Sequence, residues 1–255
     1  MMIQDFKNEN YPNFFWLHVR KSAGTSVKSI LDSNWNELDG SNGHRFVKKN
    51  PPSFLQVEPK FWNSLINIPN VNLGKHSFKR SLFARDFLYK DNWENIFSFA
   101  FSREPADRTV SMFYYLMFSK KLKISLLTTE LLKNKKLYIS TSAKFDLFLD
   151  WVEKVHQECD LFVMDRIFHT HTAPMHGDIT DNDNNIILKK VYRLENLNSA
   201  FIDIANKCNL NPNYSNINKM KNLNVQRKNF SPNHNQMARI KEIYSLDFDV
   251  YENAY

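Results

Sequence analysis

The stretch "FFWLHVRKSAGTSVKSIL", residues 14–31, joins an apolar run to a helical pattern through a short basic loop. The loop gathers small residues, hydroxyls and a lysine in a chain that has only 5 glycines. These residues are Lys21, Ser22, Ala23, Gly24, Thr25 and Ser26. The apolar run predicts a buried strand, so the loop would stand between a strand and a helix N-terminus. Backbone amides converge at such a turn and the helix dipole adds positive potential, so the stretch predicts an anion site.

The composition of this loop favours a phosphate as the anion. Gly24 would let the backbone approach the ligand closely, and Lys21 would add a mobile positive charge. Thr25 and Ser26 would add hydroxyl donors. The segment does not match the GxxxxGK[ST] pattern of ordinary P-loops, and no acidic strand end supplies a magnesium ligand. Taken alone, the stretch also fits an ordinary capped turn between a strand and a helix.

A second segment, "IFSFAFSREPADRTVSMFYYLMF" at residues 96–118, repeats the order of buried strand, polar break and helix. Arg103 would lie at the carboxyl end of the strand, Pro105 would begin the helix, and Ser111 would follow within two turns. An arginine and a hydroxyl in this arrangement can hold another phosphate, with the arginine giving a bidentate contact. The alternative is a surface ion pair of Arg103 with Glu104 or Asp107.

The alternation of strand and helix signals predicts an α/β fold of the P-loop-like, three-layer kind, with a central, mainly parallel sheet flanked by helices. Strands are predicted at 14–19, 71–73, 96–102 and 186–191. Helices are predicted near Thr25, after Pro105, and over 144–158, 197–209 and 236–251. No stretch reads as a linker, so we expect a single domain over residues 1–255. Parallel sheets of this kind bind ligands at the carboxyl ends of their strands.

Composition limits the function classes. The 255 residues are 42% hydrophobic, which suffices for a sizeable core, and the formal net charge is +7. The N-terminal residues lack a signal-peptide pattern and no apolar stretch reaches membrane-span length. The two cysteines, Cys159 and Cys208, are too few for a disulfide scaffold. We therefore expect a soluble, cytoplasmic protein without a transmembrane segment; its oligomeric state cannot be read from the sequence.

Positive charge gathers in two runs. Residues 120–144 contain 7 lysines and one glutamate, and residues 204–241 contain 7 lysines and arginines with no acidic residue. An unopposed basic run favours an anion nearby, which leaves nucleic acid, a nucleotide or an acidic substrate as partners. A nucleic-acid-binding protein and a nucleotide-dependent phosphotransferase are the alternative functions. Two point-like phosphate sites on buried strands argue against the first, and the missing magnesium carboxylates argue against the second.

The two motifs together resemble those of the sulfotransferases. "HVRKSAGTS" at 18–26 is similar to their 5′-phosphosulfate-binding loop, and "FSREPADRTVS" at 101–111 is similar to their 3′-phosphate motif. Weaker likenesses, at "GKHSF" (74–78), "YRLENLNSAF" (192–201) and the terminal "IYSLDFDVYENAY" (243–255), point to the Golgi-type carbohydrate sulfotransferases. The chain departs from the family pattern at Arg20, where a proline is common, and at Lys75, which is inserted before His76.

The resemblance implies 3′-phosphoadenosine 5′-phosphosulfate (PAPS) as the sulfuryl donor and a sugar hydroxyl on a glycan or glycolipid as the acceptor, with no metal. It implies that residues 21–26 hold the 5′-phosphate, with Lys21 at the departing oxygen, and that Arg103 and Ser111 hold the 3′-phosphate. It also implies that a basic segment containing Arg227 and Lys228 covers the nucleotide.

Histidines supply the candidates for a catalytic base. His76 follows the predicted strand 71–73 and would emerge at the same edge as the two loops, and His44 is the second candidate. The resemblance implies that His169 and His171 lie near the acceptor, and His44 is a further candidate for binding the substrate. A group of three histidines and two aspartates could alternatively bind a metal ion: His169, His171, His176, Asp165 and Asp178.

Overall fold

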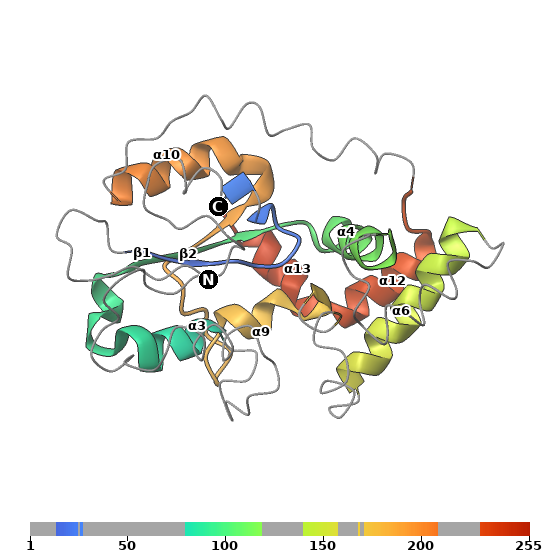
Figure 1. Cartoon of the computed structure of the whole chain (residues 1–255), viewed down its shortest axis with the longest axis horizontal. Coiled ribbons are helices and arrows are strands. Elements are labelled where there is room, and N and C mark those ends of the chain that lie inside the picture. The colour runs from blue at the N-terminus through green and yellow to red at the C-terminus, as the bar shows by residue number, and fades with distance from the viewer. Residues whose placement is uncertain are drawn as a thin grey trace.

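A computed structural model of the chain describes residues 14–24, 26–27, 80–118, 140–157, 168, 171–208 and 230–255. Within these described residues the sheet has three parallel strands in the order β1-β2-β3, so that β2 lies between the other two. The strands are β1 (Phe14–Leu17), β2 (Phe97–Ser102) and β3 (Lys190–Arg193). In Figure 1 the sheet crosses the middle of the molecule, with helices above and below it. The predicted α/β class is therefore confirmed.

The described helices alternate with these strands along the chain. Before β2 come α3 (Arg80–Phe83), η3 (Ala84–Tyr89) and η4 (Lys90–Asn95). After β2 come α4 (Pro105–Phe118) and α6 (Thr141–Gln157). Next come α9 (Met175–Ile179) before β3, and η5 (Leu194–Asn196) and α10 (Leu197–Cys208) after it. The chain ends with α12 (His234–Ile243) and α13 (Ser245–Glu252).

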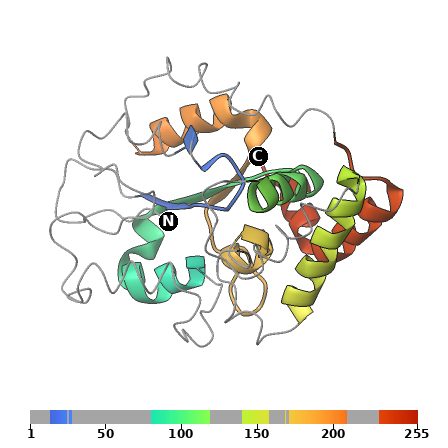
Figure 2. The same ribbon diagram turned by 45° about the vertical axis from the view of Figure 1, so that its right-hand side comes forward.

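Side-chain alternation in the strands gives the sheet two buried faces. Phe14 and Trp16 of β1 join a cluster that includes Phe201 of α10. Phe15 and Leu17 join a second cluster, with side chains from η3, α9 and α13. Figures 1 and 2 show α10 on one side of the sheet and α3 and α9 on the other. The near-continuous apolar runs follow from this arrangement, because both faces of each strand are covered.

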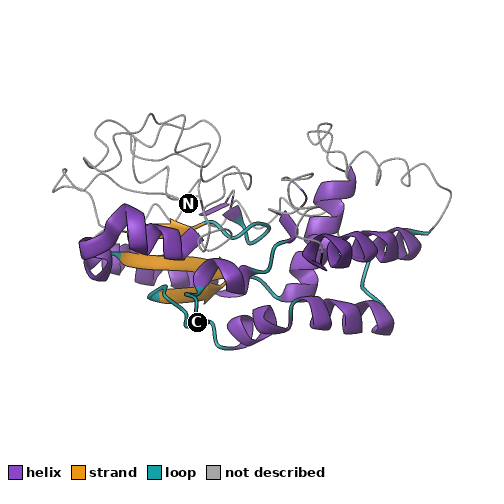
Figure 3. Ribbon diagram, turned by 90° about the horizontal axis from the view of Figure 1, so that it is seen from below, coloured by secondary structure: helices purple, strands orange, loops and turns teal. Residues whose placement is uncertain are grey.

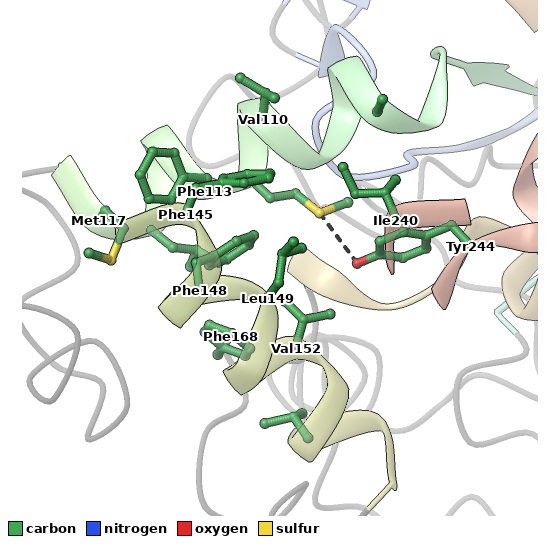
Figure 4. Packing of buried hydrophobic residues seen from close by; sticks show 14 residues of the cluster. Val110, Phe113, Met117, Phe145, Phe148, Leu149, Val152, Phe168, Ile240 and Tyr244 are labelled. Carbon is green, nitrogen blue, oxygen red and sulfur yellow. Dashed lines mark hydrogen bonds between the residues drawn. The ribbon is translucent and has the colours of Figure 1, made fainter. Parts of the chain in front are cut away.

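A helical cluster of α4, α6 and α12 extends the molecule beyond the sheet, on one side of the view in Figure 3. Its core is aromatic: Phe113 of α4 packs edge-on against Phe145 of α6 at 5.1 Å between ring centroids, and close to Phe148. Figure 4 shows these rings beside Leu149 and Ile240. The tyrosine that separates α12 from α13, Tyr244, donates its hydroxyl to the Thr172 carbonyl oxygen at 2.7 Å. This hydrogen bond gives the buried hydroxyl a partner at the point where the two helices meet.

Two predicted elements differ from the structure. The apolar run 186–191 predicts a strand, but β3 begins at Lys190; Ile186 instead forms an isolated antiparallel bridge with Thr180 and is 47% exposed. Asp181, whose carboxylate accepts from the amides of Asp183 and Asn185, closes this turn. The helix predicted over 236–251 is two helices that meet at Tyr244. The predicted strand 71–73 lies outside the described residues.

Candidate active site

The two predicted phosphate loops leave neighbouring strands at the same edge of the sheet. β1 and β2 are parallel and paired, with Leu17 opposite Ala100. The loop after β1 and the segment around Arg103 after β2 therefore begin side by side. This placement follows from the pairing of β1 with β2 alone.

The loop after β1 has the backbone of an anion-binding turn. Lys21 and Ala23 have positive φ angles of 66° and 51°, although neither is a glycine. Left-handed residues alternating with right-handed ones bring successive amides to one concave side. The Ser22 side chain is buried, and its Oγ has no hydrogen-bond partner among the described residues. Ser22 is thus a donor that a bound phosphate could engage.

Gly24 is required here by close packing and not by an unusual φ angle. It begins a helical turn, in which the Val27 amide donates to the Ala23 carbonyl at 3.0 Å. A Cβ at this position would lie 1.6 Å from Nε2 of His18. The His18 ring stacks on Trp16 of β1, with 5.2 Å between ring centroids. The imidazole therefore lies between the strand and the loop, and only glycine leaves room for it.

Arg103 forms a weak ion pair that a bound ligand could replace. Its Nη2 is 3.4 Å from the Asp107 carboxylate, one helical turn away, and the Asp107 side chain is 67% exposed. Glu104 instead accepts from the Asp107 amide at 2.6 Å and so caps the start of α4. An exposed pair of this length contributes little stability. Arg103 can therefore exchange this carboxylate for a phosphate at little cost.

Ser111, the predicted partner of Arg103, lies on the buried side of α4. Only 1% of its surface is exposed. Its burial means that a phosphate could reach it only if the ligand enters beside α4. A role for Ser111 stays a prediction.

Two residues beside Lys21 form an aromatic wall that sequence reasoning only partly anticipated. The Lys21 Nζ lies 4.0 Å from the ring centroid of Tyr115 on α4. Tyr115 stacks in turn on His171, at 4.7 Å between ring centroids. The distance from the Lys21 Nζ to the centre of the His171 ring is therefore at most the sum of these two distances. The structure brings together Lys21 and His171, and it adds Tyr115, which lies four residues after Ser111 on the same helix.

A buried ion pair contacts the loop after β1. Arg108 on α4 donates from Nη1 to Asp247 of α13 at 2.5 Å, and both side chains are almost fully buried. The same guanidinium donates to the Arg20 carbonyl in the loop and to the Ala173 carbonyl. Asp247 is 139 positions away along the chain, so no local pattern could predict the pair. The only signal was that Arg108 shares a helical face with Ser111.

A half-buried histidine, His156, adjoins the ion pair. Burial, together with the positive charge of Arg108, lowers the pKa of His156 to about 4, while the charge of Asp247 acts in the opposite sense. The His156 ring meets the Tyr244 ring edge-on at 6.1 Å. His156 is therefore neutral at physiological pH.

The segment that leads out of "GKHSF" is also tied to the loop. Arg80, the first residue of α3, donates from Nη1 to the His18 carbonyl oxygen at 3.2 Å and forms a bidentate ion pair with Asp178 of α9. Asp178, one member of the possible metal group, is thus engaged by an arginine. Among the residues that the structure describes, no three His, Cys, Asp or Glu side chains gather as metal ligands would.

Several predicted site residues lie outside the described residues, and their roles stay predictions. They are Thr25, His44, His76, His169, Arg227 and Lys228. Within the described part of the chain, no helix is both long and apolar enough to span a bilayer.

A comparison with protein families agrees with this geometry. The model of the sulfotransferase family matches residues 4–255, nearly the whole chain. The chain therefore belongs to the sulfotransferase family, an enzyme family that uses PAPS as its sulfuryl donor. No curated protein and no solved structure matches the chain.

Proposed function

We propose that this protein transfers the sulfuryl group of PAPS to a hydroxyl of a carbohydrate acceptor, a glycan or a glycolipid. The observation that carries the proposal is the meeting of two anion-competent loops at the ends of β1 and β2. A nucleotide with a phosphate at each end of its ribose needs two such sites at one edge. The Ser22 hydroxyl, which has no hydrogen-bond partner among the described residues, and the weakly held Arg103 are the donors expected of a site that binds phosphate.

In this proposal the residues around the 5′-phosphate are those of the loop 21–26, and Arg103 and Ser111 hold the 3′-phosphate. Bound PAPS supplies an activated sulfuryl group on a phosphate leaving group. An acceptor oxygen forms the new S–O bond as the bond to the phosphate oxygen breaks, and a base takes the hydroxyl proton. We assign Lys21 to stabilise charge at the departing oxygen, because it belongs to the loop that would hold the 5′-phosphate. No metal is needed, because the leaving phosphate is weakly basic.

For the base we propose His76, with His44 as the second candidate. Support comes from Arg80, which follows His76 by four residues and contacts the His18 carbonyl at the start of the loop. His169 and His171 are proposed on the acceptor side, and Arg227 and Lys228 over the nucleotide. The contact of His171 with Tyr115, beside Lys21, supports the acceptor-side assignment. A cytoplasmic location is proposed as well.

The experiment is transfer of radiolabelled sulfate from PAPS to a panel of glycans and glycolipids. We expect label on at least one glycan, and we expect His76→Ala to bind adenosine 3′,5′-bisphosphate normally while its transfer rate falls by about 100-fold or more. His234→Ala, at an exposed histidine of α12, is the matched control and should transfer as the wild type does. A fully active His76→Ala enzyme would move the base to another histidine.

Ligand-induced stabilisation separates this function from the alternatives. Adenosine 3′,5′-bisphosphate at 100 times its Kd should stabilise the fold by about 2.7 kcal/mol. ATP with magnesium should stabilise less, and oligonucleotides only at low salt. Stabilisation by ATP alone would favour a phosphotransferase, and stabilisation by neither nucleotide would refute the proposal.

A further inference from the structure

We infer that Arg108 is a positioning residue that sets the orientation of the peptide between Arg20 and Lys21, and so prepares the loop for the 5′-phosphate. The inference rests on the proposed function and concerns a residue that need not touch the nucleotide. Three contacts of one buried guanidinium carry it. They join α4 to the loop, to the segment after His171 and to α13.

The contact with the loop is specific to one peptide unit. Nε of Arg108 donates to the Arg20 carbonyl oxygen at 3.3 Å. The described residues contain no cis peptide bond, so the N–H of the same unit, which belongs to Lys21, points the opposite way. With its carbonyl held toward α4, this peptide cannot present an oxygen to an anion in the loop. It presents the Lys21 amide instead.

The loop needs such a constraint because its backbone is unfavourable. Lys21, whose φ is 66°, follows the held carbonyl directly, and Ala23 has a φ of 51°. Residues other than glycine reach this region only where their surroundings stabilise it. Within the loop, Val19 and Ser22 contribute backbone contacts, but the Ser22 amide is 3.4 Å from its acceptor. Arg108 adds a charged donor at the point where the backbone changes hand.

The other contacts of Arg108 make it rigid. Asp247 accepts from Nη1 at 2.5 Å, and it also accepts from the amides of Met175 and His176 at 2.8 Å each. Nη2 donates to Ala173, two residues after His171. The ion pair is closed to solvent, so its geometry cannot relax by rotation into water. The same guanidinium thus fixes the loop relative to the segment that follows His171 in the aromatic wall.

The test is Arg108→Lys, which keeps a positive charge for Asp247 but lacks the planar fork that reaches three acceptors. The matched control is Arg239→Lys. Arg239 of α12 also pairs with two carboxylates, Asp150 and Glu153, but both lie on α6. Affinities are measured by calorimetry for adenosine 3′,5′-bisphosphate and for adenosine 3′-monophosphate, which lacks the 5′-phosphate. Amide hydrogen exchange at Lys21 and Ser22 is measured on the same proteins without ligand.

We expect Arg108→Lys to weaken binding of the bisphosphate by about tenfold or more, the scale of a charged hydrogen bond, and to leave binding of the 3′-monophosphate unchanged. Exchange at the Lys21 amide should be faster. Arg239→Lys should change neither. Equal weakening of both nucleotides would mean general damage and would overturn the inference, as would a folded Arg108→Lys protein with wild-type affinity. Failure of the wild type to bind the bisphosphate would instead overturn the proposed function, and the inference with it.

Discussion

The packing of Gly24 against His18 gives a prediction whose size follows from the structure. A Cβ at residue 24 would lie 1.6 Å from Nε2 of His18, and 2.4 and 2.5 Å from the two neighbouring ring carbons. Ordinary contact needs about 3.5 Å, so in Gly24→Ala the ring and the loop must together move apart by roughly 2 Å. Moving the ring gives up its stacking on Trp16, about 0.5–1.5 kcal/mol, and shifting the backbone costs about 1–3 kcal/mol.

Gly24→Ala should therefore lower the free energy of unfolding by about 2–4 kcal/mol. Backbone strain does not add to this cost, because the φ angle of Gly24 is outside the left-handed region and alanine is the better helix former. In a His18→Ala background the clash is gone, so adding Gly24→Ala should cost nothing or stabilise slightly. The two changes should couple strongly although each alone destabilises.

The assay is a double-mutant cycle by urea unfolding of the wild type, both single variants and the double variant. We expect a coupling free energy of about 2 kcal/mol or more between residues 18 and 24. Calorimetry should show that Gly24→Ala also loses affinity for adenosine 3′,5′-bisphosphate and that the double variant recovers part of it. A coupling below about 0.5 kcal/mol would show that the imidazole does not determine the residue at position 24, and the reasoning would be wrong.

Further variants test the second loop and the half-buried histidine. Arg103→Ala should weaken the binding of adenosine 3′,5′-bisphosphate and of the 3′-monophosphate by about 1.5–3 kcal/mol each, measured by calorimetry, and should leave binding of the 5′-monophosphate unchanged. Wild-type affinity for the first two nucleotides would exclude Arg103 from the 3′-site. His156, whose pKa falls from 6.5 unfolded to about 4 folded, contributes stability that is complete above pH 6.5 and declines as the pH falls toward 4. Between pH 7 and pH 5 it should account for a loss of about 2 kcal/mol in urea unfolding. His156→Gln should abolish this part of the pH dependence and exposed His234→Gln should not; equal curves for His156→Gln and the wild type would contradict the assignment.

Local sequence patterns predict much of the fold and the two loops at the centre of the candidate site. The strand-to-helix turns at residues 14–27 and 97–118 were readable because apolar runs, small residues and a proline follow one another within a few positions. Parallel pairing then brings the two loops together, as the alternation of strands and helices predicts.

What the sequence could not reveal depends on distant contacts. Arg108 looks like a surface arginine on a helix, and only the fold shows that Asp247 meets it inside the core. The break at Tyr244 has no helix-breaking residue, and the hydroxyl of this tyrosine reaches Thr172 across the helical cluster, a contact between distant segments. Ile186 looks like a strand residue, but the turn closed by Asp181 precedes β3 and moves its start to Lys190. Tyr115 carries no motif, and its partners Lys21 and His171 come from other segments.

A crystal structure of the complex with adenosine 3′,5′-bisphosphate tests the central claim most directly. The account predicts one nucleotide across the ends of β1 and β2, with its 5′-phosphate on the amides of the loop at Lys21 and its 3′-phosphate on Arg103. A nucleotide bound elsewhere, or one that contacts only one of the two loops, would contradict it.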